Sequence, residues 1–226
     1  MQGKIMLRRI LHSKQFILGL VLVLILCFVA IFADQLAPHD PNEYSEARLQ
    51  APEWFSRGTE GYILGTDSTG RDILSRMIIG AKSSMQVALL STFLSLVIGT
   101  ILGIVAGFKG GILDAIIMRS TEVTMAVPTM TLGVVIMAIF GTSMLNLLIV
   151  MVISYWMNFS RVARNEVMAI RNREFVQASR ALGATNFHIM FTQILPNVTT
   201  SLIICTSNCF GSVILTESTL SYLYLL

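Results

Sequence analysis

Apolar runs alternate with polar intervals along this chain, and five of the apolar runs approach the length needed to cross a bilayer. A transmembrane helix takes about 20 mostly apolar residues, because the hydrocarbon core is about 30 Å thick. The pattern therefore predicts an all-α integral membrane protein. We expect its spans near residues 16–33, 85–108, 114–140, 145–159 and 198–215.

The first apolar run has 18 residues without a charge and follows a basic, acid-free segment. A secretory signal peptide is the alternative, but its apolar core is usually about 7–15 residues long. We therefore favour an uncleaved span. The basic segment before it predicts a cytosolic N-terminus, because cytosolic flanks are enriched in basic residues. Its basic residues are Lys4, Arg8, Arg9 and Lys14. The turn at 141–146, expected outside, has no basic residue.

The interval 34–84 is predicted to be an extracytoplasmic loop, so that 1–84 forms an N-terminal segment with one span. Within it, Gly65 to Gly80 predicts a turn followed by an amphipathic helix, capped by Thr69 or Asp67. The alternative is an irregular loop that only covers the membrane surface.

Small residues mark one face of the second predicted span. Gly99, Gly103 and Gly107 continue a four-residue spacing that begins at Ser91 and Ser95. Such faces let membrane helices approach closely. We therefore expect these glycines to serve helix packing.

Charged residues and a proline interrupt two other spans. Asp114, Arg119 and Glu122 lie near one end of the third span, Pro128 near its middle, and Glu217 near the outer end of the fifth. Intramembrane charges are candidates for function, although residues near helix ends can also pair or reach the interface. Pro128 predicts a kink, since proline removes a backbone donor.

Composition excludes several function classes. Only 13% of residues are charged, against about 25% in soluble domains, and the net charge is +3. No basic patch suggests nucleic acid. The three cysteines lie in apolar runs without a CxxC pair, and the three histidines are scattered, so we expect no metal site and no bound cofactor.

The polar interval 161–197 separates the fourth and fifth spans. It is longer than helix connections of about 2–8 residues. We predict a helix over 161–182 ended by Gly183, then a short helix over 187–193 capped by Thr185 or Asn186 and ended by Pro196. The result is a cytosolic helix–turn–helix with a small tip. The alternative is a loop that only joins two spans.

This interval resembles the EAA loop of ABC-importer permeases, whose form is EAA, three residues, Gly, nine residues, Ile, one residue and Leu-Pro. Gly183, Leu195 and Pro196 match in identity and spacing. Gln177, Ser179 and Gln193 depart from the usual Glu, Ala and Ile. The loop residues implied by the resemblance are Glu174, Gln177, Ala178, Ser179, Arg180, Ala181, Leu182, Gly183, Ala184, Leu195 and Pro196.

Further segments are similar to the C-type permeases of dipeptide, oligopeptide and nickel importers. They are LGTDSTGRDILSRMIIGAKSSM, MAVPTM, REFVQASRALGAT and ILPN, in that order. The resemblance covers nearly the whole chain. It implies the type I ABC importer transmembrane fold, with an ABC transmembrane type-1 domain over 85–226.

The resemblance also implies the partners. These are a second homologous permease subunit, cytosolic ATP-binding subunits and an extracytoplasmic solute-binding protein, assembled in the cell membrane. The chain itself is expected to bind no ATP and to catalyse nothing. In agreement, it has no GxxxxGK[ST] run.

The end of the chain departs from the family pattern. Leu220, Ser221 and Leu223 match the usual LSFLGLG, but Tyr224, Leu225 and Leu226 replace Gly-Leu-Gly. A sixth span would normally follow. We therefore expect a C-terminally truncated sequence with five spans of six.

Two functions of other classes remain as alternatives. One is an ion-coupled secondary transporter using Asp114, Arg119, Glu122 or Glu217, although no internal repeat typical of such folds is visible. The other is a membrane scaffold that recruits a partner through 161–197. For the importer, we favour peptides over nickel as the solute.

Overall fold

The computed structural model describes residues 13–225 except 47, 57 and 59. The basic residues Lys4, Arg8 and Arg9, used above for orientation, lie outside the described residues. The chain divides into two compact units, Met1–Met85 and Gln86–Leu226, which we describe one at a time.

The first unit contains helices α2 (Lys14–Ile31) and α3 (Ala33–Leu36) and a loop of turns. Ser13 caps α2, since its hydroxyl accepts the Phe16 N–H. No residue of α2 is buried in the structure. This is the pattern of a helix whose apolar surface meets lipid or another chain, as a membrane span does.

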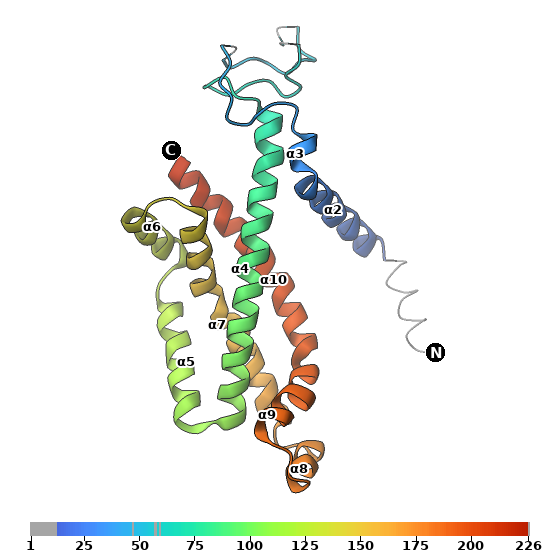
Figure 1. The fold of residues 1–226 in the computed structure, drawn as a ribbon, viewed down its shortest axis with the longest axis vertical. Helices are drawn as coiled ribbons and strands as arrows, with labels where there is room; N and C mark the ends of the chain where they lie inside the picture. The colour runs from blue at the N-terminus through green and yellow to red at the C-terminus, as the bar shows by residue number, and fades with distance from the viewer. Residues whose placement is uncertain (1–12, 47, 57, 59, 226) are drawn as a thin grey trace. The chain divides into compact units, whose positions relative to one another are not determined.

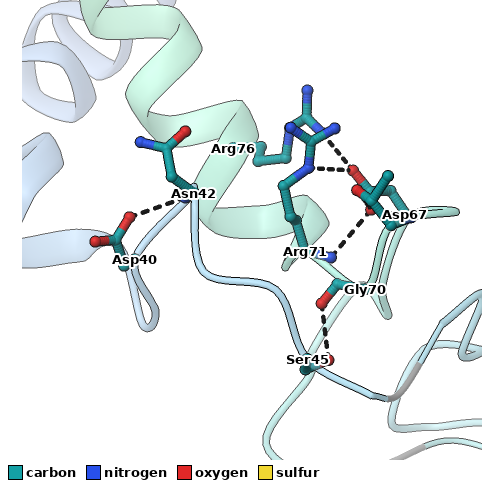
Figure 2. Close-up of polar contacts among 8 residues, drawn as sticks. Asp40, Asn42, Ser45, Asp67, Gly70, Arg71 and Arg76 are labelled. Carbon is teal, nitrogen blue, oxygen red and sulfur yellow. Dashed lines mark hydrogen bonds and ion pairs between the residues drawn. The ribbon is translucent and has the colours of Figure 1, made fainter.

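The loop is organised by Asp67 (Figure 2). Its carboxylate accepts the backbone N–H groups of Thr69 and Arg71 at 2.8 and 3.0 Å, and it pairs with the guanidinium groups of Arg71 and Arg76. Burial alone would raise the pKa of Asp67, but the hydrogen bonds from Thr69 and Arg71 outweigh it and lower that pKa well below its ordinary value. Asp67 therefore stays charged.

The predicted cap and boundary of the next helix are wrong. Asp72, and not Thr69 or Asp67, caps α4, because its Oδ2 accepts the Ser75 N–H at 3.0 Å. Helix α4 then runs unbroken over Ile73–Lys109, so the expected amphipathic helix and the second span form one helix. Gly80 lowers helix propensity by only about 1 kcal/mol and does not end it.

The second unit is a helical bundle. It contains the rest of α4, then α5 (Gly111–Ala126), α6 (Thr129–Phe140), α7 (Met144–Ile170), α8 (Glu174–Ala181), α9 (Asn186–Ile189), the π-helical turn η1 (Met190–Ile194) and α10 (Leu195–Leu225). Helix α7 packs against α5, α6 and α10. Helices α8 and α9 lie at one end of the bundle, and α6 lies toward the other (Figure 1).

The third span is broken. Helices α5 and α6 meet at an angle of 81° across Val127 and Pro128. Four helices of the described chain are long and apolar enough to cross a membrane, and five spans result if this bent pair is counted as one.

Two predicted helix ends are wrong. The helix expected over 161–182 is interrupted, because α7 ends at Ile170 and α8 begins at Glu174. Pro196 does not end a helix, because helical structure continues from Asn186 to Leu223. Pro196 directly follows the wider π turn η1 and lies in the first turn of α10. A π turn shifts the hydrogen-bond pattern, so the missing proline donor is accommodated there.

Two clusters of buried apolar residues hold the second unit together. One joins α4, α7, α8 and α10 through residues that include Phe108, Phe159, Val176 and Ile194. The other joins α4, α6, α7 and α10 and includes Met137, Met151 and Leu220. The first cluster reaches α8 and η1, so the connection between α7 and α10 is anchored to the bundle.

Candidate functional site: the connection between α7 and α10

Helix α8 presents apolar side chains to solvent. Its Val176 is fully buried against the bundle, but Phe175 is half exposed. Leu182, directly after α8, is 88% exposed. Phe187 and Phe191 on the next turns are also exposed, with ring centroids 4.4 Å apart. An exposed apolar group concentrated in one short segment is typical of an interaction surface.

The turn after α8 depends on Gly183. Its φ of +83° is a conformation that L side chains rarely adopt. The turn is closed by hydrogen bonds from Gly183 N to Arg180 O and from Ala184 N to Ser179 O, each 3.0 Å. Thr185 then caps α9, as predicted, by accepting the His188 N–H at 3.3 Å. No atom of the described chain lies near a side chain built at Gly183, so the surface there is open.

Two arginines fasten this connection to the end of α4. The Arg171 Nη1 donates to the Gly107 carbonyl at 2.8 Å. The Arg180 guanidinium lies 4.9 Å from the centroid of the Phe108 ring. The two contacts place α8 beside the α4–α5 turn.

Side chains at the three positions that depart from the EAA pattern also make hydrogen bonds. The Gln177 amide donates to the Asn172 carbonyl at 2.8 Å. The Gln193 amide donates to the Ser179 hydroxyl, which joins η1 to α8. The connection also has small side chains at Ala178, Ala181 and Ala184. Leu195 and Pro196 lie in the first turn of α10.

The glycines of α4 lie directly against α7. A methyl group built on Gly99, Gly103 or Gly107 would come within 2.2, 2.3 or 2.8 Å of the carbonyl oxygen of Trp156, Ser160 or Arg164. These distances are shorter than van der Waals contact. The two helix backbones therefore approach as closely as glycine allows.

The predicted charged residues fall into different settings. Arg119 and Glu122 form an exposed ion pair at 2.7 Å on α5. Glu217 is buried in α10 and accepts the Ser221 hydroxyl at 3.0 Å. Asp114 pairs with Arg164 of α7, a partner that sequence reasoning missed. An acid and an arginine near the same end of two spans are the only signal that could have suggested this pair.

Metal chemistry finds no support in the described residues, which contain no group of three or more His, Cys, Asp or Glu side chains able to hold an ion. The sulfur atoms of Cys205 and Cys209 lie 3.9 Å apart on α10.

A bundle of helices long and apolar enough to cross a membrane, with the short helix α8 at one end, defines a class: a multi-pass membrane protein. Residues 99–225 match the family described as the binding-protein-dependent transport system inner membrane component, and the chain belongs to this family, with the type I ABC importer membrane fold. Residues 2–52 match the N-terminal transmembrane domain of oligopeptide transport permease C.

Relatives with curated names support the same family assignment. The chain is 38% identical over 213 residues to the di/tripeptide transport system permease protein DppC of Pseudomonas aeruginosa, covering 94% of the chain and 70% of the relative. It is 40% identical to the dipeptide transport system permease protein DppC of Escherichia coli K12 (94% and 71%). It is 31% identical to the oligopeptide transport system permease protein OppC of Bacillus subtilis (95% and 69%). All three relatives are named as transport system permease proteins.

Proposed function

We propose that this chain is a membrane-spanning subunit of an ATP-driven importer and forms half of a translocation path for di- or oligopeptides. A second, homologous permease subunit supplies the other half. The names of the relatives, which specify dipeptide, di/tripeptide and oligopeptide transport, support this solute class.

In this proposal α8 is the coupling helix that docks into a cleft of a cytosolic ATPase. The exposure of Leu182 carries the argument, because this side chain is 88% exposed beside an open glycine turn and lies in a short segment whose Phe175, Phe187 and Phe191 are also exposed. Exposed apolar side chains grouped in this way are typical of an interaction surface. The contacts of Arg171 and Arg180 with the end of α4 would pass motion of α8 to the bundle.

The remaining partners follow from this arrangement. ATP is bound and hydrolysed on the partner subunits, and a solute-binding protein delivers peptide on the opposite side of the membrane. The N-terminus and α8 are cytosolic, which agrees with the arginines at 171, 173 and 180 and with the absence of charge from the α6–α7 turn.

Replacing Gly183 with aspartate tests the docking role. The variant places a charge and a strained residue at the tip of the connection, so ATPase that co-purifies with the permease should fall strongly. Gly141→Asp is the matched control, since Gly141 has a φ of +84°, also lies in open space, and belongs to the turn near the other end of the bundle. Undiminished ATPase with Gly183→Asp would count against the proposal.

A further inference from the structure

Two grooves that differ in polarity flank α10. One, of about 400 Å³, lies between α4 and the η1–α10 segment and is lined almost entirely by apolar side chains such as Ile101 and Ile203. Its Thr199 and Thr206 hydroxyls donate to carbonyls of their own helix. The hydroxyl of Thr100, which also lines this groove, has no hydrogen-bond partner in the described chain, but it is buried and does not meet the groove surface. Lipid tails can therefore cover this groove.

The other groove, of about 660 Å³, lies between α7 and α10 and has a mixed lining, with more polar side chains than the first groove. The side chains that give it this character are Asn158, Arg161, Glu166, Ser201, Asn208 and Ser212. Asn208 and Ser212 are exposed on α10. Within the described chain, the Asn208 side-chain amide has no hydrogen-bond partner.

Covering this second groove with lipid tails would be energetically unfavourable. A polar group left without a hydrogen bond in hydrocarbon costs several kcal/mol. Asn208 lies well within the α10 stretch that is long and apolar enough to cross the membrane. Polar groups within spans, such as the Asn208 amide, generally face water or the interior of an assembly. We therefore expect the α7–α10 groove to face water or another protein chain, and not lipid.

The groove offers both signs of charge. Glu166 uses Oε1 to accept the Ser201 hydroxyl at 2.6 Å, and no basic residue of the described chain pairs with it. Among the described residues, the Arg161 guanidinium donates its only hydrogen bond to the Met125 sulfur, at 2.7 Å, and it forms no ion pair. A carboxylate and a guanidinium without counter-charges thus line the same groove, together with amides and hydroxyls.

This combination fits one solute class. A short peptide carries an ammonium group, a carboxylate and peptide groups that both donate and accept hydrogen bonds. A divalent metal would instead need several carboxylate, imidazole or thiolate ligands, and the described residues hold no such group.

We propose that the α7–α10 groove is this chain's wall of the solute path, and that Arg161 and Glu166 bind the carboxylate and the ammonium of a short zwitterionic peptide in transit. The inference rests on the proposed permease function and assigns the solute class to particular residues.

Cysteine labelling tests whether water fills the groove. Single cysteines replace Asn208 and Ser212 in a chain without its native cysteines, assembled with its partner subunits in membrane vesicles. A membrane-impermeant methanethiosulfonate reagent should modify both positions. Ile203→Cys is the matched control, because Ile203 is 61% exposed on the same helix but lines the apolar groove. Protection of Asn208→Cys and Ser212→Cys, or equal labelling of all three, overturns the assignment.

Charge neutralisation tests the binding of peptide termini. Glu166→Gln and Arg161→Gln should each lower uptake of a labelled dipeptide about tenfold, since a charge-assisted hydrogen bond is lost. Glu166→Asp should restore part of it. Glu122→Gln and Arg119→Gln, which neutralise the exposed pair on α5, are controls expected to change uptake little. Unchanged uptake in the Glu166 and Arg161 variants overturns this part. A failure of the proposed permease function would give a different result, because the unaltered chain would then neither take up peptide nor co-purify with an ATPase.

Discussion

The side-chain amide of Gln193 on η1 donates a hydrogen bond to the hydroxyl of Ser179 on α8. Two of the three departures from the EAA pattern are therefore in contact. Where that pattern places an alanine and an isoleucine, this chain has a polar pair. The Gln193 Oε1 is buried without a partner among the described residues, so the polar pair is only partly satisfied.

This contact predicts that the two substitutions act together. Ser179→Ala alone should lower stability by about 1–3 kcal/mol, because it leaves the partly buried Gln193 amide N–H without its acceptor. The double variant Ser179→Ala/Gln193→Ile should recover most of that loss, since replacing both partners by apolar groups removes the unsatisfied atoms. Melting temperatures of the detergent-purified complex measure the cycle.

Gln177→Ala serves as the control for this cycle, because the Gln177 amide is exposed and bonds only to the nearby Asn172 carbonyl. Its effect should add independently to either variant. A double variant that is less stable than both single variants would contradict the coupling.

The close approach of α4 and α7 predicts a sharp response at Gly103. Alanine there brings a methyl group to 2.3 Å from the Ser160 carbonyl and 2.8 Å from the Ala163 methyl. The helices must move apart, so we expect a loss of about 1–3 kcal/mol, measured as a lower melting temperature.

Gly80→Ala is the matched control on the same helix. No atom of the described chain lies within 4 Å of a methyl group built there. Because alanine favours helix over glycine by about 1 kcal/mol, this variant should be neutral or slightly more stable. Equal destabilisation by both variants would show that the α4–α7 contact does not decide the effect.

The sequence predicted the all-α membrane fold class, because hydrocarbon imposes a strict requirement for long apolar runs. It also predicted the break near Pro128, since proline removes a backbone donor, although the 81° bend exceeds an ordinary kink. The helix boundaries were less predictable. Gly80 and Pro196 usually suggest helix ends, but the first sits in a long α-helix and the second follows a π turn that accommodates it.

The contacts of the candidate site were only partly accessible to sequence reasoning. The positive φ of Gly183 follows from local chain geometry, and the motif spacing pointed to it. By contrast, Arg171 and Gly107 are 64 positions apart, and Glu166 and Ser201 are 35 apart. Such pairs depend on how the helices pack, which no local pattern specifies.

Asp67 predicts a defined pH response in the first loop. Its pKa is lowered in the folded chain, so the stabilisation that it provides is fully present above its unfolded pKa of about 3.9 and is lost as the pH falls toward the folded value. Hydrogen-exchange protection of the Thr69 and Arg71 amides should therefore stay constant from about pH 7 to about pH 4.5.

Asp67→Asn should lower that protection throughout this range, because the amide cannot form ion pairs with Arg71 and Arg76. Asp40→Asn is the control, since the Asp40 carboxylate accepts only the Asn42 N–H within the described loop. Protection in the unaltered chain that declines already between pH 7 and pH 5 would be inconsistent with a lowered pKa.

The pair between Arg164 and Asp114 predicts a charge-specific effect on the bundle. The guanidinium donates two hydrogen bonds to the carboxylate, Nε to Oδ1 at 2.5 Å and Nη2 to Oδ2 at 2.6 Å, and joins α7 to α5. Both side chains are largely buried. Asp114→Asn should cost about 1.5–3 kcal/mol, because it leaves the arginine without its counter-charge. Arg164→Lys should cost nearly as much, since lysine cannot form the bidentate contact.

The exposed pair of Arg119 and Glu122 separates this effect from a general loss of charge. Its side chains are 80% and 59% exposed, so Glu122→Gln should change stability by less than about 1 kcal/mol. The charge-reversed double variant Asp114→Arg/Arg164→Asp should recover part of the loss seen in each reversed single variant. Melting temperatures that rank Glu122→Gln with Asp114→Asn, or a reversed pair no better than its single variants, would show that the α5–α7 contact does not depend on this ion pair.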